Sequence, residues 1–320
     1  MEEPGSRTLA DIGEFGLIDR IVDHTSMTEC VVVGPGDDTA VISTSGEVLI
    51  TSDMLVEGVH FKQDWSTAID VGRRAAAASL ADIAAMGGSA RTLIVSFGAP
   101  ASTPSSWAIG CATGLREEAA KAGACVAGGD VVASPIIVVN VTALGDAPKG
   151  GAILRSGARV GDRVAICGRF GWAAAGLAVL SRGFRSPRAL VDAHRFPDID
   201  YAAGVAAARS ATAMIDVSDG LIADAGHIAR ASDVSIDIDT NSWEIPDAIA
   251  ATAAAYNVDP RVWMLTGGDD HALLATFGPR RKLPAGFTVI GMVIEQGEFL
   301  VLTDGKPCEY PSGFEHFTTK

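Results

Sequence analysis

The sequence of 320 residues is long enough for two ordinary domains or one large one. Its hydrophobic fraction of 48% and charged fraction of 20% are those of a folded protein. Its formal net charge of −14 argues against nucleic acid as the main partner, because phosphate backbones are bound by clustered Lys and Arg. The five dispersed cysteines lack any Cys-x-x-Cys pair, so we expect no disulfide framework, no zinc site and a cytoplasmic location. The acidic N-terminus and the short apolar runs predict neither a secretory signal nor a membrane span.

The first half of the chain is predicted to alternate strands and helices. In chain order the predicted elements are a helical pattern at 17–22, strands at 31–33, 39–43 and 48–52, a helix at 70–86, a strand at 92–97, a helix at 107–122, and strands at 125–127 and 136–144. The Ala-rich stretch 70–86 is the strongest of these, because Gly87-Gly88 ends it. We expect Gly128-Gly129-Asp130 to form a loop between the last two strands.

A stretch rich in glycine, 145–162, is the predicted domain junction, giving an N-terminal domain at 1–148 and a C-terminal domain at 149–320. The second half repeats the alternation. Its predicted elements are strands at 163–167, 213–217, 234–238 and 271–277, and helices at 172–180, 201–208, 221–231 and 248–256. Mixed strands and helices, with many fully apolar strands, predict an α/β or α+β layered fold.

Nine aspartates lie beside glycine turns or at the ends of apolar strands. They are Asp37, Asp38, Asp53, Asp82, Asp130, Asp216, Asp219, Asp269 and Asp270. Carboxylates in apolar surroundings are costly to bury unless a cation meets them. Hard oxygen ligands of this kind suit Mg²⁺, and glycines beside them let a backbone approach phosphate closely. The pattern therefore predicts a metal–nucleotide site assembled from distant segments.

Two of these aspartates contradict local preferences. Asp82 lies near the C-terminal end of the 70–86 helix, where the helix dipole disfavours an anion, and Asp216 lies inside an apolar strand end. The other acids have simpler alternatives. Asp37 could belong to an ordinary acidic turn, and Ser218 or Asp219 could be the N-cap of the following helix.

The roles of the polar side chains near these acids are open as well. The hydroxyls of Thr51 and Ser52 could share metal and phosphate contacts with Asp53. His60 is better interpreted as a hydrogen-bonded histidine than as a catalytic base, and Arg155 is by default a surface arginine. No Walker A motif, protein-kinase catalytic loop or Gly-x-Gly-x-x-Gly fingerprint occurs, so ATP chemistry would need another scaffold.

Taken together and in this order, seven segments resemble the thiamine-monophosphate kinase family, of the superfamily that includes aminoimidazole ribonucleotide synthetase and selenophosphate synthetase. The segments are Gly36-Asp37-Asp38, Thr51-Ser52-Asp53 with the 57–61 run, 80–87, Gly128-Gly129-Asp130, Leu154-Arg155-Ser156-Gly157, Ser218-Asp219-Gly220-Leu221 and Gly267-Gly268-Asp269-Asp270. The likeness extends over nearly the whole chain.

The resemblance implies transfer of the γ-phosphoryl group of ATP onto the phosphate of thiamine monophosphate, giving thiamine diphosphate. It also implies a homodimer whose N-terminal domains join their sheets into a barrel, with ATP and several Mg²⁺ ions in a cleft that the C-terminal domain completes. The implied Mg²⁺ ligands are Asp37, Thr51, Asp53, Asp82, Asp130, Asp216 and Asp219, with Ser52 beside them. The implied ATP contacts are Gly129, Asp130, Arg155 and Ser218, and the implied substrate contacts are His60, Asp269 and Phe317. No general base is implied, because the acceptor is a phosphate.

The chain departs from the family pattern in three places. Ser79-Leu80-Ala81-Asp82 stands where the family commonly has Asn-x-Ser-Asp, and Val131-Val132-Ala133 replaces two threonines and an arginine. Gly-Gly-Glu-Asp-Tyr-Glu becomes a segment ending in Asp269-Asp270-His271-Ala272. Two alternatives stay open, another ATP-dependent enzyme of the superfamily and a non-catalytic dimer that binds Mg²⁺ and nucleotide. A selenophosphate synthetase is disfavoured, because the first cysteine is Cys30.

Overall fold

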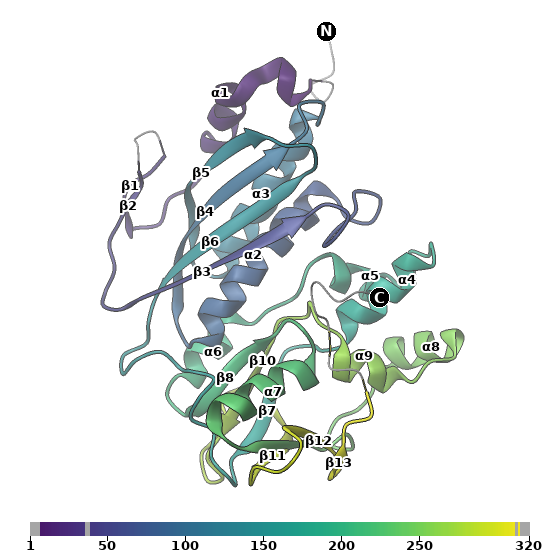
Figure 1. Ribbon diagram of the computed structural model, residues 1–320. Helices are drawn as coiled ribbons and strands as arrows, with labels where there is room; N and C mark the ends of the chain where they lie inside the picture. The colour runs from purple at the N-terminus through teal and green to yellow at the C-terminus, as the bar shows by residue number, and fades with distance from the viewer. Residues whose placement is uncertain (1–6, 36–38, 311–312, 314–320) are drawn as a thin grey trace. The chain divides into compact units, whose positions relative to one another are not determined.

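The structure is a computed structural model that describes residues 7–35, 39–310 and 313. It divides into two compact units (Figure 1). Unit 1 comprises 1–83 and 89–147, and unit 2 comprises 84–88 and 148–320. The short piece 84–88 belongs to unit 2 because the Ile153 N–H donates to the Met86 carbonyl, 3.0 Å away. Within the described residues, no helix is long and apolar enough to cross a membrane.

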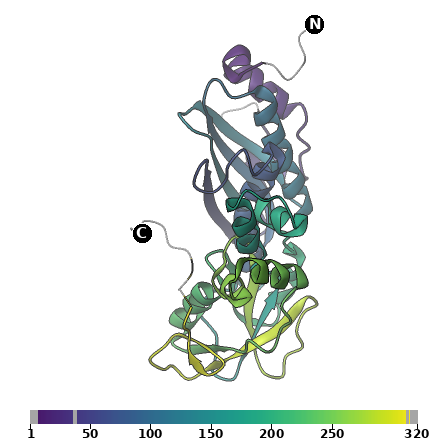
Figure 2. The same ribbon diagram turned by 90° about the vertical axis from the view of Figure 1, so that its right-hand side faces the viewer.

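Unit 1 is a four-stranded sheet with helices on one face (Figure 1, Figure 2). The strand order is β3 (Val48–Val56), β6 (Val138–Asp146), β4 (Ser89–Ala99) and β5 (Cys125–Ala133). The β3/β6 and β6/β4 pairs are antiparallel, and β4/β5 is parallel. The remaining elements are α1 (Leu9–Val22), α2 (Ala68–Ala85), α3 (Ser105–Lys121), β1 (Val31–Val33) and β2 (Val41–Ile42).

The side chains of β3 alternate between two environments. Leu49, Thr51 and Asp53 are partly covered, whereas Val48, Ile50 and Met54 are 43%, 68% and 53% exposed. In a strand, successive side chains point to opposite faces, so one face of the sheet is covered by helices and the other carries exposed apolar side chains. The covered face contacts a core that includes Leu80, Ile83, Leu93, Val139 and Val141.

Unit 2 is built on a seven-stranded mixed sheet in the order β13-β12-β9-β11-β7-β10-β8. Its strands are β7 (Arg163–Cys167), β8 (Ala211–Val217), β9 (Ser235–Ile238), β10 (Ala272–Phe277), β11 (Phe287–Ile294), β12 (Val301–Thr303) and β13 (Lys306–Pro307). Its helices are α4 (Trp172–Ser181), α5 (Arg188–Arg195), α6 (Tyr201–Ala207), α7 (Leu221–Ser232), α8 (Asp247–Tyr256) and α9 (Pro260–Thr266). Strands β7, β8 and β10 are almost entirely apolar and buried, which places the sheet at the core of this unit.

The mixed α/β architecture expected from the sequence is confirmed, but one segment was wrongly predicted. Gly128-Gly129-Asp130 is not a loop; it continues β5, paired in parallel with Ile94, Val95 and Ser96 of β4. A Cβ added to Gly129 would lie 2.1 Å from the Val95 carbonyl oxygen. The glycine is therefore required by a close backbone approach between strands and not by a turn.

Glycines also bring α2 and α3 into backbone contact. A Cβ at Gly72 would lie 2.0 Å from the Cys111 carbonyl oxygen, and one at Gly114 would lie 2.1 Å from the Ile69 carbonyl oxygen. Both atoms belong to helical backbone, which cannot yield as the end of a flexible side chain can. The crossing of these two helices therefore depends on the absence of a side chain at both positions.

We expect Gly72→Ala to lower the free energy of unfolding by roughly 3 kcal/mol, because the new methyl group overpacks a rigid crossing. Gly16→Ala in α1 is the matched control, since its Cβ would meet no atom nearer than 3.6 Å. That variant should be stabilised by up to about 1 kcal/mol through helix propensity alone. Urea denaturation measures both, and a Gly72→Ala variant as stable as the control would contradict the interpretation.

Candidate functional site

In unit 1, strand alternation places Thr51 and Asp53 of β3 against α2. The Thr51 hydroxyl donates to Asp82 Oδ2 at 2.6 Å. The Ser79 hydroxyl oxygen lies 2.7 Å from Asp53 Oδ2 and 2.9 Å from the Val141 carbonyl oxygen. Two carboxylates and a hydroxyl from a strand and a helix therefore form one group, which we call the β3/α2 group (Thr51, Asp53 and Asp82).

The β3/α2 group fits a divalent cation. Asp82 lies in the last turn of α2, where the helix dipole disfavours an anion, and the Thr51 hydroxyl that donates to it is neutral. Carboxylate and hydroxyl oxygens are the donors that Mg²⁺ prefers. A cation bound here would offset both the dipole and the repulsion between the two carboxylates.

Ser52 does not belong to this group. Its side chain points to the opposite face of the sheet, where its hydroxyl lies 3.0 Å from Thr142 Oγ1 and 3.3 Å from Asn140 Oδ1. The structure therefore places the Ser52 hydroxyl away from the β3/α2 group, and its share in a ligand shell stays a prediction. The physical reason is the two-residue period of a strand, which separates adjacent side chains.

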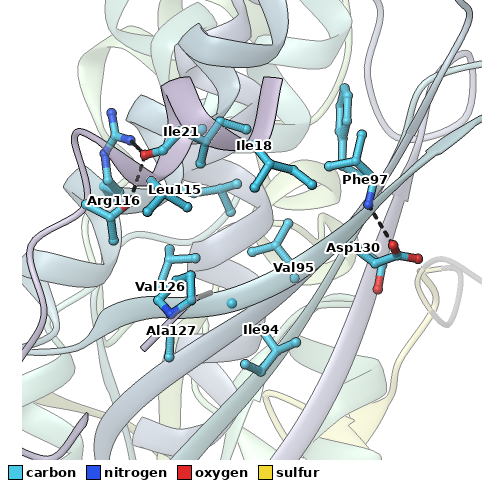
Figure 3. Close-up of a pocket in the computed structure, with 18 of the residues that line it drawn as sticks. Ile18, Ile21, Ile94, Val95, Phe97, Leu115, Arg116, Val126, Ala127 and Asp130 are labelled. Atoms are coloured by element: carbon cyan, nitrogen blue, oxygen red, sulfur yellow. Dashed lines mark hydrogen bonds between the residues drawn. The ribbon is translucent and has the colours of Figure 1, made fainter. Parts of the chain in front are cut away.

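At the other edge of the sheet, β5 borders a cavity of about 480 Å³ (Figure 3). Its lining comes from α1, α3, β4 and β5 and includes Ile18, Ile21, Ile94, Ala112, Leu115 and Val126. The Arg116 guanidinium also lines it, held by the Ile21 carbonyl at 3.2 Å and Thr113 Oγ1 at 3.1 Å. Gly129 and Asp130 belong to the lining, and the exposed Asp130 carboxylate accepts the Val131 N–H at 2.9 Å. A mostly apolar cavity with charged groups on its lining is typical of a small-molecule site.

Asp53 and Asp130 lie at opposite edges of the sheet. Strand register aligns Asp53 with Val141, Val95 and Gly129 across the sheet, and Asp130 follows Gly129 on β5, so at least three interstrand spacings, roughly 14 Å, separate the two acids. Mg²⁺ binds its oxygen ligands at about 2.1 Å. One ion therefore cannot bind both carboxylates of the same subunit.

In unit 2, Asp216 is buried at the end of β8, as the sequence predicted, with 3% of its surface exposed. Its carboxylate lies 2.8 Å from the imidazole Nδ1 of His271, at the start of β10. This partner could not be predicted from the sequence, because the two residues are 55 positions apart.

The turn after β8 holds a second set of acids. Neither Ser218 nor Asp219 is the N-cap of α7; that position is Gly220, and the predicted caps are wrong. Instead the Asp224 carboxylate, one turn inside the helix, accepts the N–H groups of Asp219 and Gly220, each at 3.1 Å. Asp224 therefore ties the turn before α7 to the first turn of the helix.

Asp224 and His227 are functional candidates that sequence reasoning missed. Ligand atoms of Asp219, Asp224 and His227 all lie within 4.8 Å of one another. Burial, together with the charges of Asp216 and Asp219, raises the pKa of Asp224 to about 7. The only sequence signal was the spacing of Asp224 and His227, three residues apart on one helix. The crowding of carboxylates here again fits a divalent cation.

Arg155 and Ser218 belong to the same region of unit 2. The Arg155 carbonyl accepts the Ser232 hydroxyl at 3.1 Å, and its side chain is exposed. Burial lowers the pKa of His227, and the positive charge of Arg155 lowers it further, so the guanidinium lies near that imidazole. The Ser218 carbonyl accepts the N–H of Asp269 at 2.9 Å, which joins the turn to the 267–271 loop.

Three predicted substrate contacts have different outcomes. His60 Nδ1 accepts the Val56 N–H at 3.0 Å, which confirms its interpretation as a hydrogen-bonded histidine. Asp269 lies in the 267–271 loop with a left-handed backbone, φ 66°. Phe317 lies outside the described residues, and so does the predicted metal ligand Asp37.

Comparison with known proteins agrees with this architecture. Residues 36–147 match the family AIR synthase related protein, N-terminal domain. The chain is 45% identical over 316 residues to the thiamine-monophosphate kinase of Mycobacterium tuberculosis (strain CDC 1551 / Oshkosh), covering 98% of this chain and 94% of that protein. The crystal structure of thiamine monophosphate kinase from Aquifex aeolicus matches with a TM-score of 0.77 at 29% identity, over 95% of this chain and 100% of that one. The structure of AaThiL complexed with AMPPCP and TMP matches with a TM-score of 0.79 at 32% identity, over 97% and 99%.

A second acid in the 267–271 loop, Asp270, is buried under α4. Its Oδ1 accepts the Ala173 N–H at 3.0 Å, and no hydrogen-bond partner of Oδ2 is present among the described residues. Burial raises the pKa of Asp270 to about 7, and the charge of Asp269 adds to the effect, although the Ala173 N–H opposes it. Because the folded pKa lies above the unfolded value of 3.8, its contribution to stability is present below about pH 4 and is lost as the pH rises through 7.

We therefore expect the wild type to lose more stability than Asp270→Asn when the pH is raised from 5 to 8. The neutral amide does not have to ionise, whereas the buried carboxyl does. Melting temperatures of both proteins at the two pH values measure the effect. Asp247→Asn, at an exposed acid on α8, should show no such shift, and parallel curves for Asp270→Asn would contradict the assignment.

Proposed function

Because the chain belongs to the thiamine-monophosphate kinase family, we propose that the oxygen ligands of unit 1 and the turn and loop of unit 2 each take part in its reaction. The reaction is the ATP-dependent phosphorylation of thiamine monophosphate to thiamine diphosphate. The observation that carries this function is the 45% identity over 98% of the chain, supported by a relative's structure that contains AMPPCP and TMP. The cytoplasmic location predicted from the cysteines is part of the proposal, in line with five free thiols.

Phosphoryl transfer depends on positioning and charge neutralisation more than on covalent catalysis by side chains. An oxygen of the substrate phosphate attacks the γ-phosphorus, the bond to the bridging oxygen breaks, and ADP leaves with that electron pair. The acceptor oxygen is already ionised, so no side chain has to remove a proton. The repulsion between two anionic substrates is the main barrier that the protein must overcome.

Several Mg²⁺ ions would be held by the acids of both units. In unit 1 the ligands are the β3/α2 group and Asp130, and in unit 2 they are Asp216 and Asp219, with Asp37 as the remaining predicted ligand. When bound, Mg²⁺ supplies positive charge that bridges and neutralises the phosphates. The helix-end position of Asp82 and the crowding around Asp224 support this assignment.

The cavity at β5 is the proposed place of the nucleoside part of ATP. Its walls are mostly apolar, which suits a flat base, and Gly129 and Asp130 supply close backbone and a carboxylate at its lining. Arg155 and Ser218 of unit 2 complete the proposed ATP contacts. His60, Asp269 and Phe317 are the proposed contacts of thiamine monophosphate.

The proposed homodimer is supported by the free edges and the open face of the unit 1 sheet. Asp53 and Asp130 each lie on an edge strand of the sheet, and the open face carries exposed Ile50, Met54 and Val132. Joining β3 of one copy to β5 of another would pair both free edges, bury this face in a barrel and bring the strand that carries Asp53 beside the strand that carries Asp130 of the other copy. A complete site would then draw on both subunits.

The function is tested by incubating purified protein with ATP, Mg²⁺ and thiamine monophosphate and separating the products by chromatography. Thiamine diphosphate formed one-for-one with ADP is the expected result. ADP formation without thiamine diphosphate would favour another acceptor within the superfamily. Bound ATP without turnover would favour the non-catalytic alternative.

Ala112→Leu should raise KM for ATP about tenfold, because the larger side chain projects into the cavity and forfeits about 1.4 kcal/mol of binding. KM for thiamine monophosphate should stay unchanged. Ala120→Leu, the same change at an exposed position of α3, is the control. Equal ATP affinity in the two variants would exclude the cavity as the nucleotide site.

Asp53→Asn and Asp130→Asn should each lower kcat about 100-fold or more, since each removes a charge that holds a metal ion. Ser52→Ala should leave kcat within about twofold, because its hydroxyl points to the other face. Steady-state kinetics of the three variants measure the effect. Full activity in either aspartate variant would remove that residue from the ligand set.

A mixture of the two inactive variants tests the shared site. If Asp53 and Asp130 come from different subunits, each hybrid dimer has one intact site, and random exchange should restore about one quarter of wild-type activity. The measurement is activity after denaturing and refolding the two variants together. A mixture as inactive as its components would place both residues in the same subunit's site.

A further inference from the structure

The 267–271 loop is fastened to the turn after β8 by backbone contacts. The Asp269 N–H donates to the Ser218 carbonyl at 2.9 Å, and the His271 N–H donates to the Val217 carbonyl at 3.0 Å. A Cβ at Gly268 would lie 2.0 Å from the Ser218 carbonyl oxygen. The loop and the turn are therefore one rigid piece, in which the proposed substrate contact Asp269 and the proposed metal ligand Asp216 have fixed relative positions.

His271 adds a side-chain contact between the loop and Asp216. The Nδ1–Oδ2 distance is 2.8 Å, and the two side chains are only 9% and 5% exposed. Its backbone has φ 51°, a left-handed conformation that a residue other than glycine or asparagine adopts at some cost. The loop therefore adopts an unfavourable backbone in the conformation that brings the imidazole to this carboxylate.

Asp216 is also crowded by other acids. Its charge acts on Asp224, which Asp219 also approaches. A carboxylate with an imidazole at one oxygen keeps its second oxygen for another partner, and its rotation is restricted. Carboxylates that bind metals are in turn usually held by such outer hydrogen bonds.

We propose that His271 is a positioning residue that orients the Asp216 carboxylate toward a divalent cation and so couples the metal-binding turn to the substrate-binding loop. This inference rests on the proposed function, because it takes Asp216 as a metal ligand. The imidazole stands where the family pattern has tyrosine, so the arrangement is a property of this chain's own loop. A purely structural histidine would fill space between β8 and β10 without affecting metal affinity.

The left-handed backbone allows a sharp set of variants. His271→Asn keeps an N–H donor at the position of Nδ1 and tolerates the positive φ. His271→Gly removes the side chain and also tolerates this φ, so it isolates the loss of the imidazole from backbone strain. His271→Ala is titrated alongside, to keep the test valid should the glycine variant unfold.

The experiment is a Mn²⁺ titration of the full-length protein, with free Mn²⁺ followed by electron paramagnetic resonance and folding checked by thermal unfolding without metal. The Mn²⁺ ion whose affinity falls in Asp216→Asn is taken as the ion that the Asp216 carboxylate binds. For that ion we expect His271→Gly and His271→Ala to weaken affinity about tenfold or more and His271→Asn to restore most of it. Rescue by asparagine distinguishes orientation of the carboxylate from simple loss of packing.

Two results would overturn the inference in distinguishable ways. If Asp216→Asn weakens Mn²⁺ binding but the glycine and alanine variants bind as the wild type does, His271 is structural and the proposed ligand set stands. If Asp216→Asn itself binds Mn²⁺ normally, both the role of His271 and the assignment of Asp216 as a ligand are wrong. The kinase activity of the wild type is judged separately, from thiamine diphosphate formation.

Discussion

Repulsion between carboxylates held in apolar surroundings is the constraint on which the rest of this structure depends. Among the described residues, a hydrogen-bond partner lies at each of three acids: Thr51 at Asp82, Ser79 at Asp53 and His271 at Asp216. A hydroxyl donor satisfies an oxygen atom but leaves the negative charge in place. Carboxylates of this kind fit divalent cations. In the proposed reaction such cations would neutralise the two anionic phosphates.

The scaffold supplies what the charges need, which is rigid spacing. Backbone contact at Gly72 and Gly114 fixes α2 against α3, and the close approach at Gly129 fixes β5 against β4. The same sheet keeps Asp53 and Asp130 on opposite edges, and the proposed dimer would add a second subunit at those edges. In the proposed dimer, association would both bury apolar surface and contribute residues to the reaction.

The positions that the sequence predicted best were those where a residue contradicts its local surroundings. Asp82 at a helix end and Asp216 in an apolar strand were identified because no turn or cap explains them. Gly128-Gly129-Asp130 was misread, since glycine gives the same signal for a turn and for a close strand approach. Asp224 and His271 could not be found, because their roles depend on contacts that only the folded chain makes.

The contact between His60 and the Val56 N–H fixes more than the position of a ring. A backbone amide can only donate, so Nδ1 must be the unprotonated nitrogen, and in the neutral imidazole the proton resides on Nε2. The backbone hydrogen bond therefore sets the tautomer of His60 before any ligand binds. An imidazole prepared in this way can give a hydrogen bond to an oxygen of a phosphate, but it cannot accept one from a hydroxyl group.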